Sequence, residues 1–517
     1  MKTKYILGST FALALLATSC GLNYEPVSDY SDVTEGIDDT NPDASTEDAI
    51  IYQNRADAES ALTALYEDIR GNQNQLQLDW LLIGDVHSDN AYAGTTGSEV
   101  VDPATNDLNS TTLCVNRDWD YYMVQAARCT KFIEGVKNVA DKSLSENEIN
   151  TMSAQGKIFR AFIWFRMARM WGNIPLVTTV PGDITSDNIA DSYESYFPAQ
   201  NTEAEVYQQI IEDLEFAYQY APANNGDKTR FSKDVACALL AKVYAEKPVR
   251  DYNKVIQYVD QLTASGYALN PSYSDLFNVD MTTTNGQSVI GTPITMNTPE
   301  SILEVHYPTG SGNWASWMYG RCLEDWDYSF TWAKWITPSR DLLNAFDRIG
   351  DTQRKEQTVV YYSCAWSNYY PSDDYAFMYK VRSGYSNVYF LRYDDLLLLK
   401  AEALLNGENV DLAGAAAIID QIRARAGVKP LTAQEKGNKE TLFSLYVNER
   451  RLELACEGER WFDLVRLGIL QEAMAAAQRT DPGRLPLVYP FTEDSYLLPI
   501  PQDVLDTNPN VVQNPGY

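Results

Sequence analysis

The sequence predicts a mainly α-helical protein that carries a loop-rich insert, and three observations support this. Apolar residues recur at spacings of three and four before about residue 265 and again after residue 392, which is the period of an amphipathic helix. Several helices form short-looped pairs of about 34 to 36 residues, close to a tetratricopeptide-type repeat. Residues of about 266–391 instead combine Gly, Ser, Asn and aromatic residues with short alternating runs, a pattern typical of loops and short strands.

The first half of the chain contains most of the predicted helices. Ser145 followed by Glu148, and Thr202 followed by Glu205, are capping boxes that mark helix starts. The helix that follows Ser145 has hardly any polar face, so it should be central. The predicted helices before the insert cover residues 55–70, 119–139, 145–171, 202–220, 232–246 and 252–263.

The second half adds helices and two strands. Alternating apolar residues predict strands at 302–307 and 388–391 within the insert. A smaller segment, residues 84–117, is polar and is predicted to be loop-like. The predicted late helices cover residues 394–405, 412–425, 439–457 and 460–476.

Composition narrows the classes of partner. The chain has 517 residues, with 41 Lys and Arg against 71 Asp and Glu, which gives a net charge of -30. It has no run of basic residues, so nucleic acid is not an expected partner. Apolar residues at 45% and charged residues at 22% are typical of a packed globular protein.

The N-terminal segment predicts a membrane anchor. Lys2 and Lys4 precede an apolar stretch that is too short to span a bilayer, and residues 16–20 resemble the lipobox of a bacterial lipoprotein. We therefore expect a signal peptide at residues 1–19, lipid attachment at Cys20 and an acidic tether at 20–48. Residues 49–517 are predicted to form one domain. No later segment reaches 18 apolar residues, so the protein is expected to be anchored rather than spanning.

Six segments match the motifs of one known family, and they occur in that family's order: residues 160–177, 230–244, 301–307, 337–346, 448–464 and 498–517. Together they resemble the SusD/RagB family of outer-membrane nutrient-uptake lipoproteins. The resemblance implies a SusD-like scaffold at residues 49–265 and 392–517 with a ligand-binding insert at about 266–391. It also implies a position in the outer membrane facing the cell exterior, and a SusC-like TonB-dependent transporter as partner.

The sequence favours a binding protein over an enzyme. His87 and His306 are the only histidines, too few for a histidine metal cluster or a convincing catalytic triad. Neither a Walker A sequence nor a G-x-G-x-x-G motif opens a helix. The alternating charges of residues 449–460 are interpreted as ion pairs between two helices. We therefore predict no catalytic residue, no cofactor and no metal site.

Aromatic clustering is the main functional signal. Five of the eleven tryptophans lie within 22 residues of the insert, where an even spread would place fewer than one. A flat indole suits the apolar face of a sugar, and Asp, Asn or Arg side chains suit its hydroxyls. The alternative is that some rings fill a satellite core, which is favoured for Trp332 and Trp335. The predicted glycan-binding residues are Trp314, Trp317, Trp326, Asn313, Arg321, Asp325, Asp327, Tyr92, Asn90, Trp366 and Tyr369.

These observations predict a surface lipoprotein that binds an oligosaccharide and passes it to the transporter. The negative charge favours a neutral glycan over a highly sulfated or uronate-rich one, unless a local basic patch exists. Two alternatives remain. One is a RagB-like lipoprotein that binds peptides, and the other is a helical scaffold subunit without a ligand.

Overall fold

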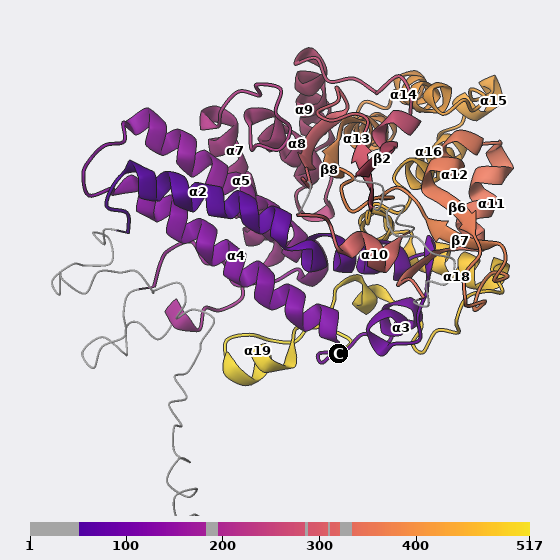
Figure 1. Cartoon of the computed structure of the whole chain (residues 1–517), viewed down its shortest axis with the longest axis horizontal. Helices are drawn as coiled ribbons and strands as arrows, with labels where there is room; N and C mark the ends of the chain where they lie inside the picture. The colour runs from indigo at the N-terminus through magenta and orange to yellow at the C-terminus, as the bar shows by residue number, and fades with distance from the viewer. Residues whose placement is uncertain (1–50, 182–194, 285–287, 309–310, 321–332) are drawn as a thin grey trace, which may run out of the picture.

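The fold comes from a computed structural model that describes residues 51–181, 195–284, 288–308, 311–320 and 333–517. The described part is mainly α-helical, and its strands form short two-stranded sheets. Figure 1 places the long N-terminal helices on one side of the molecule and the helices and strands of the insert on the other. Predicted residues outside the described part are Cys20, Arg321, Asp325, Trp326, Asp327 and Trp332.

The N-terminal helices confirm the predicted pattern closely. Both capping boxes are present: the side chains of Ser145 and Thr202 accept hydrogen bonds from the backbone of Glu148 and Glu205. The helix that starts after Ser145 is central, because it packs against the helices on either side of it in sequence. The helices are α2 (Arg55–Gly71), α4 (Leu113–Lys137), α5 (Glu146–Trp171), α7 (Glu203–Tyr220), α8 (Lys233–Tyr244) and α9 (Tyr252–Ala264).

The C-terminal helices return to this scaffold, since α13 packs against both α9 and α14. Two predicted helices were too long. The helix predicted to end at 457 stops at Glu453, and the one predicted from 460 to 476 divides at Gly468, whose φ of 72° is incompatible with a continuing helix. The helices are α13 (Tyr393–Asn406), α14 (Leu412–Arg425), α15 (Ala433–Lys436), α16 (Lys439–Glu453), α17 (Arg460–Arg466), α18 (Leu470–Thr480) and α19 (Gln502–Thr507).

The smaller segment, residues 84–117, is not the polar loop that its composition suggested. It is largely buried, because distant parts of the chain satisfy its polar groups. Asp85, for example, accepts hydrogen bonds from Asn90 and from the backbone of Gly458. This region holds most of the π-helical turn η2 (Leu82–Val86), the strand β1 (Ala91–Ala93), the helix α3 (Ser98–Thr105) and the start of α4. The π-helical turn η1 (Asn74–Asp79) precedes it.

The insert is built from antiparallel strand pairs and three short helices. The two predicted strands, observed as β4 (Ser301–Val305) and β8 (Val388–Arg392), pair with each other, with Val305 opposite Val388. The other pairs are β1 with β5 (Ile336–Pro338), β2 (Val279–Thr284) with β3 (Ser288–Pro293), and β6 (Val359–Tyr362) with β7 (Tyr375–Met378). The three short helices are α10 (Ala315–Tyr319), α11 (Arg340–Ile349) and α12 (Thr352–Thr358), and the insert also contains the 3-10 turn η4 (Ser274–Leu276). The 3-10 turns η3 (Lys247–Val249) and η5 (Glu493–Tyr496) lie outside the insert.

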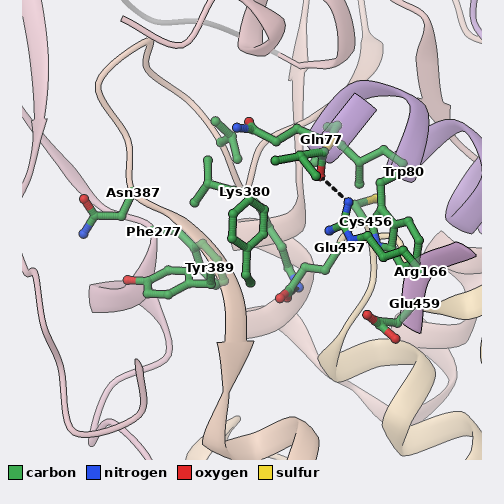
Figure 2. A pocket seen from close by; sticks show the side chains of 16 residues that line it. Gln77, Trp80, Arg166, Phe277, Lys380, Asn387, Tyr389, Cys456, Glu457 and Glu459 are labelled. Atoms are coloured by element: carbon green, nitrogen blue, oxygen red, sulfur yellow. Dashed lines mark hydrogen bonds and ion pairs between the residues drawn. The ribbon is translucent and has the colours of Figure 1, made fainter. Parts of the chain in front are cut away.

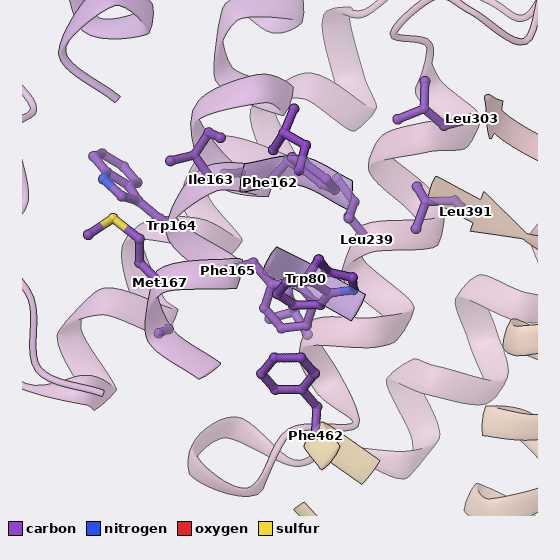
Figure 3. Close-up of a cluster of buried hydrophobic side chains, with 14 of the residues drawn as sticks. Trp80, Phe162, Ile163, Trp164, Phe165, Met167, Leu239, Leu303, Leu391 and Phe462 are labelled. Carbon is purple, nitrogen blue, oxygen red and sulfur yellow. The ribbon is translucent and has the colours of Figure 1, made fainter. Parts of the chain in front are cut away.

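One hydrophobic core extends from the scaffold into the insert (Figure 3). Phe162 and Phe165 of α5 are buried in it, and Trp80 stacks on Phe462 at a centroid distance of 4.3 Å. Leu303 of β4 and Leu391 of β8 belong to the same core. The strand pair at the edge of the insert is therefore fixed to the helical scaffold by apolar packing.

Buried ion pairs add a second connection between insert and scaffold. Arg354 of α12 pairs with Glu449 and Glu453 of α16, and all three side chains are buried. The charges of residues 449–460 therefore do form ion pairs, as predicted, but many partners lie outside the two helices. Arg450 to Asp463 joins α16 to α17 at 2.7 Å. Because a buried charge without its partner is costly, the insert is held in one position.

The C-terminal segment packs over the end of α5. The Trp171 indole nitrogen donates to the Pro499 carbonyl at 3.0 Å, and the Asn514 amide donates to the carbonyls of Trp171 and Leu498. No helix in the described ranges is both long and apolar enough to cross a bilayer.

Candidate functional site

Trp314 is presented to solvent at the start of α10. Its side chain is 48% exposed, and every other tryptophan among the described residues is buried or half-buried. Its backbone nitrogen donates to the Gln73 side chain at 2.7 Å, and the Gln73 amide also bonds the Gly312 carbonyl. An exposed indole on a turn that is fixed to the scaffold is a preformed apolar contact surface.

Asn313, one of the predicted glycan-binding residues, is buried beside Trp314. It is 1% exposed, its amide nitrogen donates to Gln77 at 2.6 Å, and its oxygen accepts from the Ala315 backbone at 3.1 Å. Short Asn side chains commonly hold turns in this way. Asn313 therefore positions Trp314.

Asn90 and Tyr92 are also interior residues rather than rim residues. Asn90 is fully buried, and it donates to Asp85 and accepts from Arg451 at 2.8 Å each. Tyr92 is 2% exposed, and its hydroxyl donates to the Asp481 carboxylate at 2.6 Å. The sequence showed polar and aromatic residues here, but it did not show that residues hundreds of positions away would cover them.

Hydrogen bonds join three segments distant in sequence into one surface, which we call the α10 surface. It comprises α10, the exit of β1 at Gly94 and the loop around Asn368. The Trp335 backbone donates to Met318 at 2.7 Å, and Gly94 donates to Trp335 at 2.9 Å. The Asn368 amide in turn donates to the Gly94 carbonyl at 2.9 Å. Trp317 is half-buried within this surface.

The second aromatic cluster is partly a satellite core. Trp366 and Tyr369 are half-buried, and the Trp366 ring meets the edges of Tyr375 and Phe377 at 5.8 and 6.0 Å. Both predicted residues therefore keep only part of their ring for a ligand. Tyr361 and Tyr362 on β6 are each 39% exposed, although neither was among the predicted binding residues.

A cavity lies where α5, β8 and the turn after α16 meet (Figure 2). Its volume is about 70 Å³, enough for a few water molecules and well below the roughly 300 Å³ of a small-molecule pocket. Lys380 pairs with Glu457 at 2.5 Å, and Arg166 stacks at 4.1 Å over Trp80. This cavity belongs to the junction between insert and scaffold and is too small for an oligosaccharide.

Three buried carboxylates, those of Glu300, Asp394 and Glu453, lie close enough to resemble a metal site. Arg392 already pairs with Glu300 at 2.9 Å and with Asp394 at 2.8 Å, while Arg425 pairs with Glu300 at 2.8 Å. Guanidinium groups thus occupy the oxygens that a cation would need. The arrangement fits an internal ion-pair cluster.

Two buried titratable groups, Asp85 and His87, lie in the segment that precedes β1. Burial raises the pKa of Asp85 to about 6, and hydrogen bonds from Asn90 and Gly458 oppose that shift. Burial lowers the pKa of His87 to about 4, and its ring lies 3.9 Å from that of Trp461. At neutral pH the imidazole is uncharged and is packed as an aromatic residue.

Two family models match the chain. One is described as "SusD family" and matches residues 350–517, and the other is described as "Starch-binding associating with outer membrane" and matches residues 38–245. A SusD-like protein of Formosa agariphila is 25% identical, covering 90% of this chain and 93% of its own length. A SusD-like protein of Bacteroides ovatus is 24% identical, covering 90% and 82%.

Solved structures are similar over the same extent. A laminarin binding SusD-like protein matches with a TM-score of 0.66 and 24% identity, covering 90% of this chain and 100% of its own. Surface glycan-binding protein A from Bacteroides fluxus matches with a TM-score of 0.67 and 20% identity, with the same coverage. At these identities the likeness establishes the fold. The mainly helical, SusD-like architecture predicted from the sequence is confirmed.

Proposed function

The chain belongs to the SusD/RagB family, and from that premise we propose that it binds an oligosaccharide at the outer membrane and delivers it to a SusC-like TonB-dependent transporter. The observation that carries the proposal is the exposed Trp314 indole on a turn fixed by Gln73 and Asn313. Support also comes from the solved relatives whose names state laminarin and surface glycan binding.

Stacking on Trp314 predicts weak binding. One ring face that covers about 100 Å² of sugar contributes about 2.5 kcal/mol at roughly 25 cal/mol per Å². Ordering of the glycan and desolvation of its hydroxyls offset a comparable amount. Because a millimolar dissociation constant already requires about 4 kcal/mol, Trp314 alone is not sufficient, and with further contacts around it we expect a dissociation constant in the range of roughly micromolar to millimolar. Weak binding suits a protein that must release its ligand.

Further contacts are proposed around Trp314. Trp317 adjoins it on the α10 surface, and Trp366 and Tyr369 lie on the loop that Asn368 connects to that surface. Four predicted contacts belong to the segment that follows α10, outside the described residues: Arg321, Asp325, Trp326 and Asp327. We propose that the glycan is mostly uncharged, because the net charge of -30 opposes a dense polyanion.

The proposed location follows from the N-terminus. Lipid on Cys20 would anchor the chain in the outer membrane, with the acidic tether leading to the folded domain. The helix pairs would contact the transporter, because such scaffolds commonly serve as extended interaction surfaces. The α10 surface would then remain free to receive the glycan.

A glycan panel tests the proposal. The purified mature chain would be titrated by calorimetry with oligosaccharides from starch, laminarin and xylan, and with a peptide digest. Saturable binding of one glycan, lost in Trp314→Ala, is the expected result. Binding of peptides alone would instead indicate a RagB-like peptide carrier. Binding of neither class would leave the scaffold function as the better description.

A further inference from the structure

Two arginines near the α10 surface lie outside the direct ion pairs that many arginines of this chain form, although, against the effect of burial, the charge of one of them, Arg484, helps to lower the pKa of Asp89. Among the described residues, neither Arg340 nor Arg484 forms an ion pair. Arg340 donates to the Tyr369 carbonyl, and its guanidinium lies 4.7 Å from the Tyr370 ring centroid. Arg484 donates through Nη1 to the Ser88 carbonyl at 3.0 Å, while its Nε and Nη2 are buried without a hydrogen-bond partner.

The two arginines lie near the same pair of tyrosines. Gly483 precedes Arg484, and a Cβ on Gly483 would lie 2.4 Å from Nη1 of Arg340, so Arg340 packs directly on that backbone. The Arg484 guanidinium lies 5.7 Å from the ring of Tyr92, which stacks on Tyr369 at 4.4 Å. Both arginines therefore flank one tyrosine pair. Tyr369 is half-exposed and belongs to the loop joined to the α10 surface.

The local charge is close to balanced although the chain is strongly acidic. Four arginines lie among four aspartates here, and one of the aspartates, Asp85, accepts a hydrogen bond from Asn90, which in turn accepts one from Arg451. Two of the other aspartates are neutralised by two of the arginines, and the last accepts hydrogen bonds from the Tyr92 hydroxyl and the Gly483 backbone. Asp89 pairs with both Arg451 and Arg460, and Asp341 pairs with Arg451. Asp481, Arg340 and Arg484 lie outside these pairs.

We propose that Arg340 and Arg484 form a subsite for one acidic substituent, a carboxylate or sulfate oxyanion, on the glycan that the α10 surface binds. The inference rests on the proposed function. A guanidinium matches the oxygens of a carboxylate or sulfate with paired donors. Unpaired buried donors are unfavourable, and an oxyanion brings the acceptors that Arg484 lacks. Tyr369 would pack against the sugar ring that carries the acid.

The subsite also defines which charged glycans are excluded. A dense polyanion would meet the field of a chain with a net charge of -30, whereas one isolated acidic group at the two arginines would interact mainly with charges within a screening length of about 8 Å at physiological salt, where arginines balance the aspartates. The predicted ligand class is therefore a mostly neutral glycan with sparse acidic substituents.

Monosaccharide probes test the subsite without knowledge of the full glycan. Ligand-observed NMR on the mature chain would compare sodium glucuronate, glucose 6-sulfate and glucose. We expect one or both acids to bind, with binding weakened between 0.05 and 0.5 M NaCl, and glucose to give no salt-sensitive binding. Signal from glucuronate alone assigns a carboxylate, and signal from the sulfate alone assigns a sulfate. If neither acid binds, the inference is wrong.

Variants identify the residues. Arg340→Gln and Arg484→Gln should each weaken acid binding about tenfold, the effect of losing about 1.4 kcal/mol, and Arg340→Lys should fall between Gln and wild type. Arg348→Gln is the matched control, because Arg348 is exposed on the same helix and should change nothing. Equal loss in all three Gln variants would indicate general electrostatics and overturn the subsite. Thermal melts identify unfolded variants, and Arg340→Gln decides the matter if Arg484→Gln does not fold.

The glycan panel keeps the two proposals separate. If neutral oligosaccharides bind through Trp314 while Arg340→Gln binds acidic sugars as tightly as wild type does, the subsite is absent and the proposed function stands. If acidic sugars bind through Arg340 but no oligosaccharide binds, the subsite stands and the glycan-carrier function fails.

Discussion

Gly84 and Gly458 are packed backbone to backbone, so that a Cβ on Gly84 would lie 2.1 Å from the Gly458 carbonyl oxygen. Gly458 has a φ of 83°, and a Cβ there would lie 2.2 Å from the Trp80 ring. The Gly458 backbone also donates to Asp85 at 2.8 Å. This contact joins the turn after α16 to the buried segment that precedes β1.

Gly84→Ala and Gly458→Ala should each destabilise the fold strongly. Neither backbone can retreat, because Asp85 and Trp80 hold the contact on both sides, so the loss should be about 3 kcal/mol or more. Chemical denaturation followed by circular dichroism measures it. Gly71→Ala is the control, since nothing lies within 4 Å of a Cβ there, and its stability should stay close to wild type. An unchanged midpoint for Gly84→Ala would contradict the close packing.

The sequence predicted the helices well because their signals are local. Ser145 with Glu148, and Thr202 with Glu205, carry both halves of a capping box within four residues, and the structure forms both. The pairing of β4 with β8 could not be predicted from local sequence patterns, since Val305 and Val388 lie far apart in sequence. The sequence did not predict the break between α17 and α18 at Gly468, because a single glycine inside an apolar pattern does not reveal its φ.

The candidate site was harder to predict, because exposure depends on distant residues. Trp314 and Asn313 are neighbours with similar sequence surroundings, yet one is 48% exposed and the other 1%. The difference arises from Gln73 and Gln77 of a remote turn, which hold their backbone and side chain. Likewise Asp481 covers the hydroxyl of Tyr92 from the far end of the chain.

Cys20→Ala should release the protein from the membrane fraction. We propose lipid on Cys20 as the anchor, because the sequence after it has no segment of 18 apolar residues that could span a bilayer. Fractionation after detergent-free washing, in cells that lack the transporter, measures the effect. Retention of the variant in the membrane there would contradict the anchor. Protease treatment of intact cells would separately show whether the wild type faces the exterior.

A SusC-like barrel should be recovered when the lipidated protein is purified in mild detergent. The expectation rests on the family and on the scaffold of helix pairs. Mass spectrometry of the purified complex identifies the partner, and a strain that carries Cys20→Ala tests whether the anchor is required for assembly. Recovery of the lipoprotein alone would favour a binder that acts without a transporter.

Trp314→Ala should weaken glycan binding about tenfold or more and leave the melting temperature near that of wild type. The indole contributes ring surface to a ligand, whereas at 48% exposure it contributes little to the core. Tyr218→Ala is the control: this exposed tyrosine lies on α7 of the scaffold, and its loss should not affect binding. Normal binding by Trp314→Ala would move the site towards Tyr361 and Tyr362.

Replacement by the matching amide should affect the stability of the fold very differently at Asp394 and at Glu453. Burial, together with Glu300 and Glu453, raises the pKa of Asp394 well above its ordinary value despite the neighbouring Arg392. Burial would also raise the pKa of Glu453, but Arg425, Arg354 and Arg392 hold it below its ordinary value. Asp394 is therefore protonated in the folded protein at pH values where Glu453 is ionised.

Asn has the shape of a protonated Asp. The free energy of unfolding of Asp394→Asn should therefore stay within about 1 kcal/mol of the wild-type value at pH 5. Glu453→Gln leaves arginines buried without their partner and should cost about 3 to 5 kcal/mol. The sign of the pH dependence follows from linkage. Because folded Asp394 holds a proton that the unfolded chain releases above about pH 4, wild-type stability falls as pH rises through that window, by up to about 1.4 kcal/mol per unit.

Asp394→Asn removes this titration, so its stability relative to wild type should increase from pH 5 to pH 8. Urea denaturation at several pH values measures the difference between the two proteins. A variant that becomes relatively less stable as pH rises would show that Asp394 is ionised in the folded state.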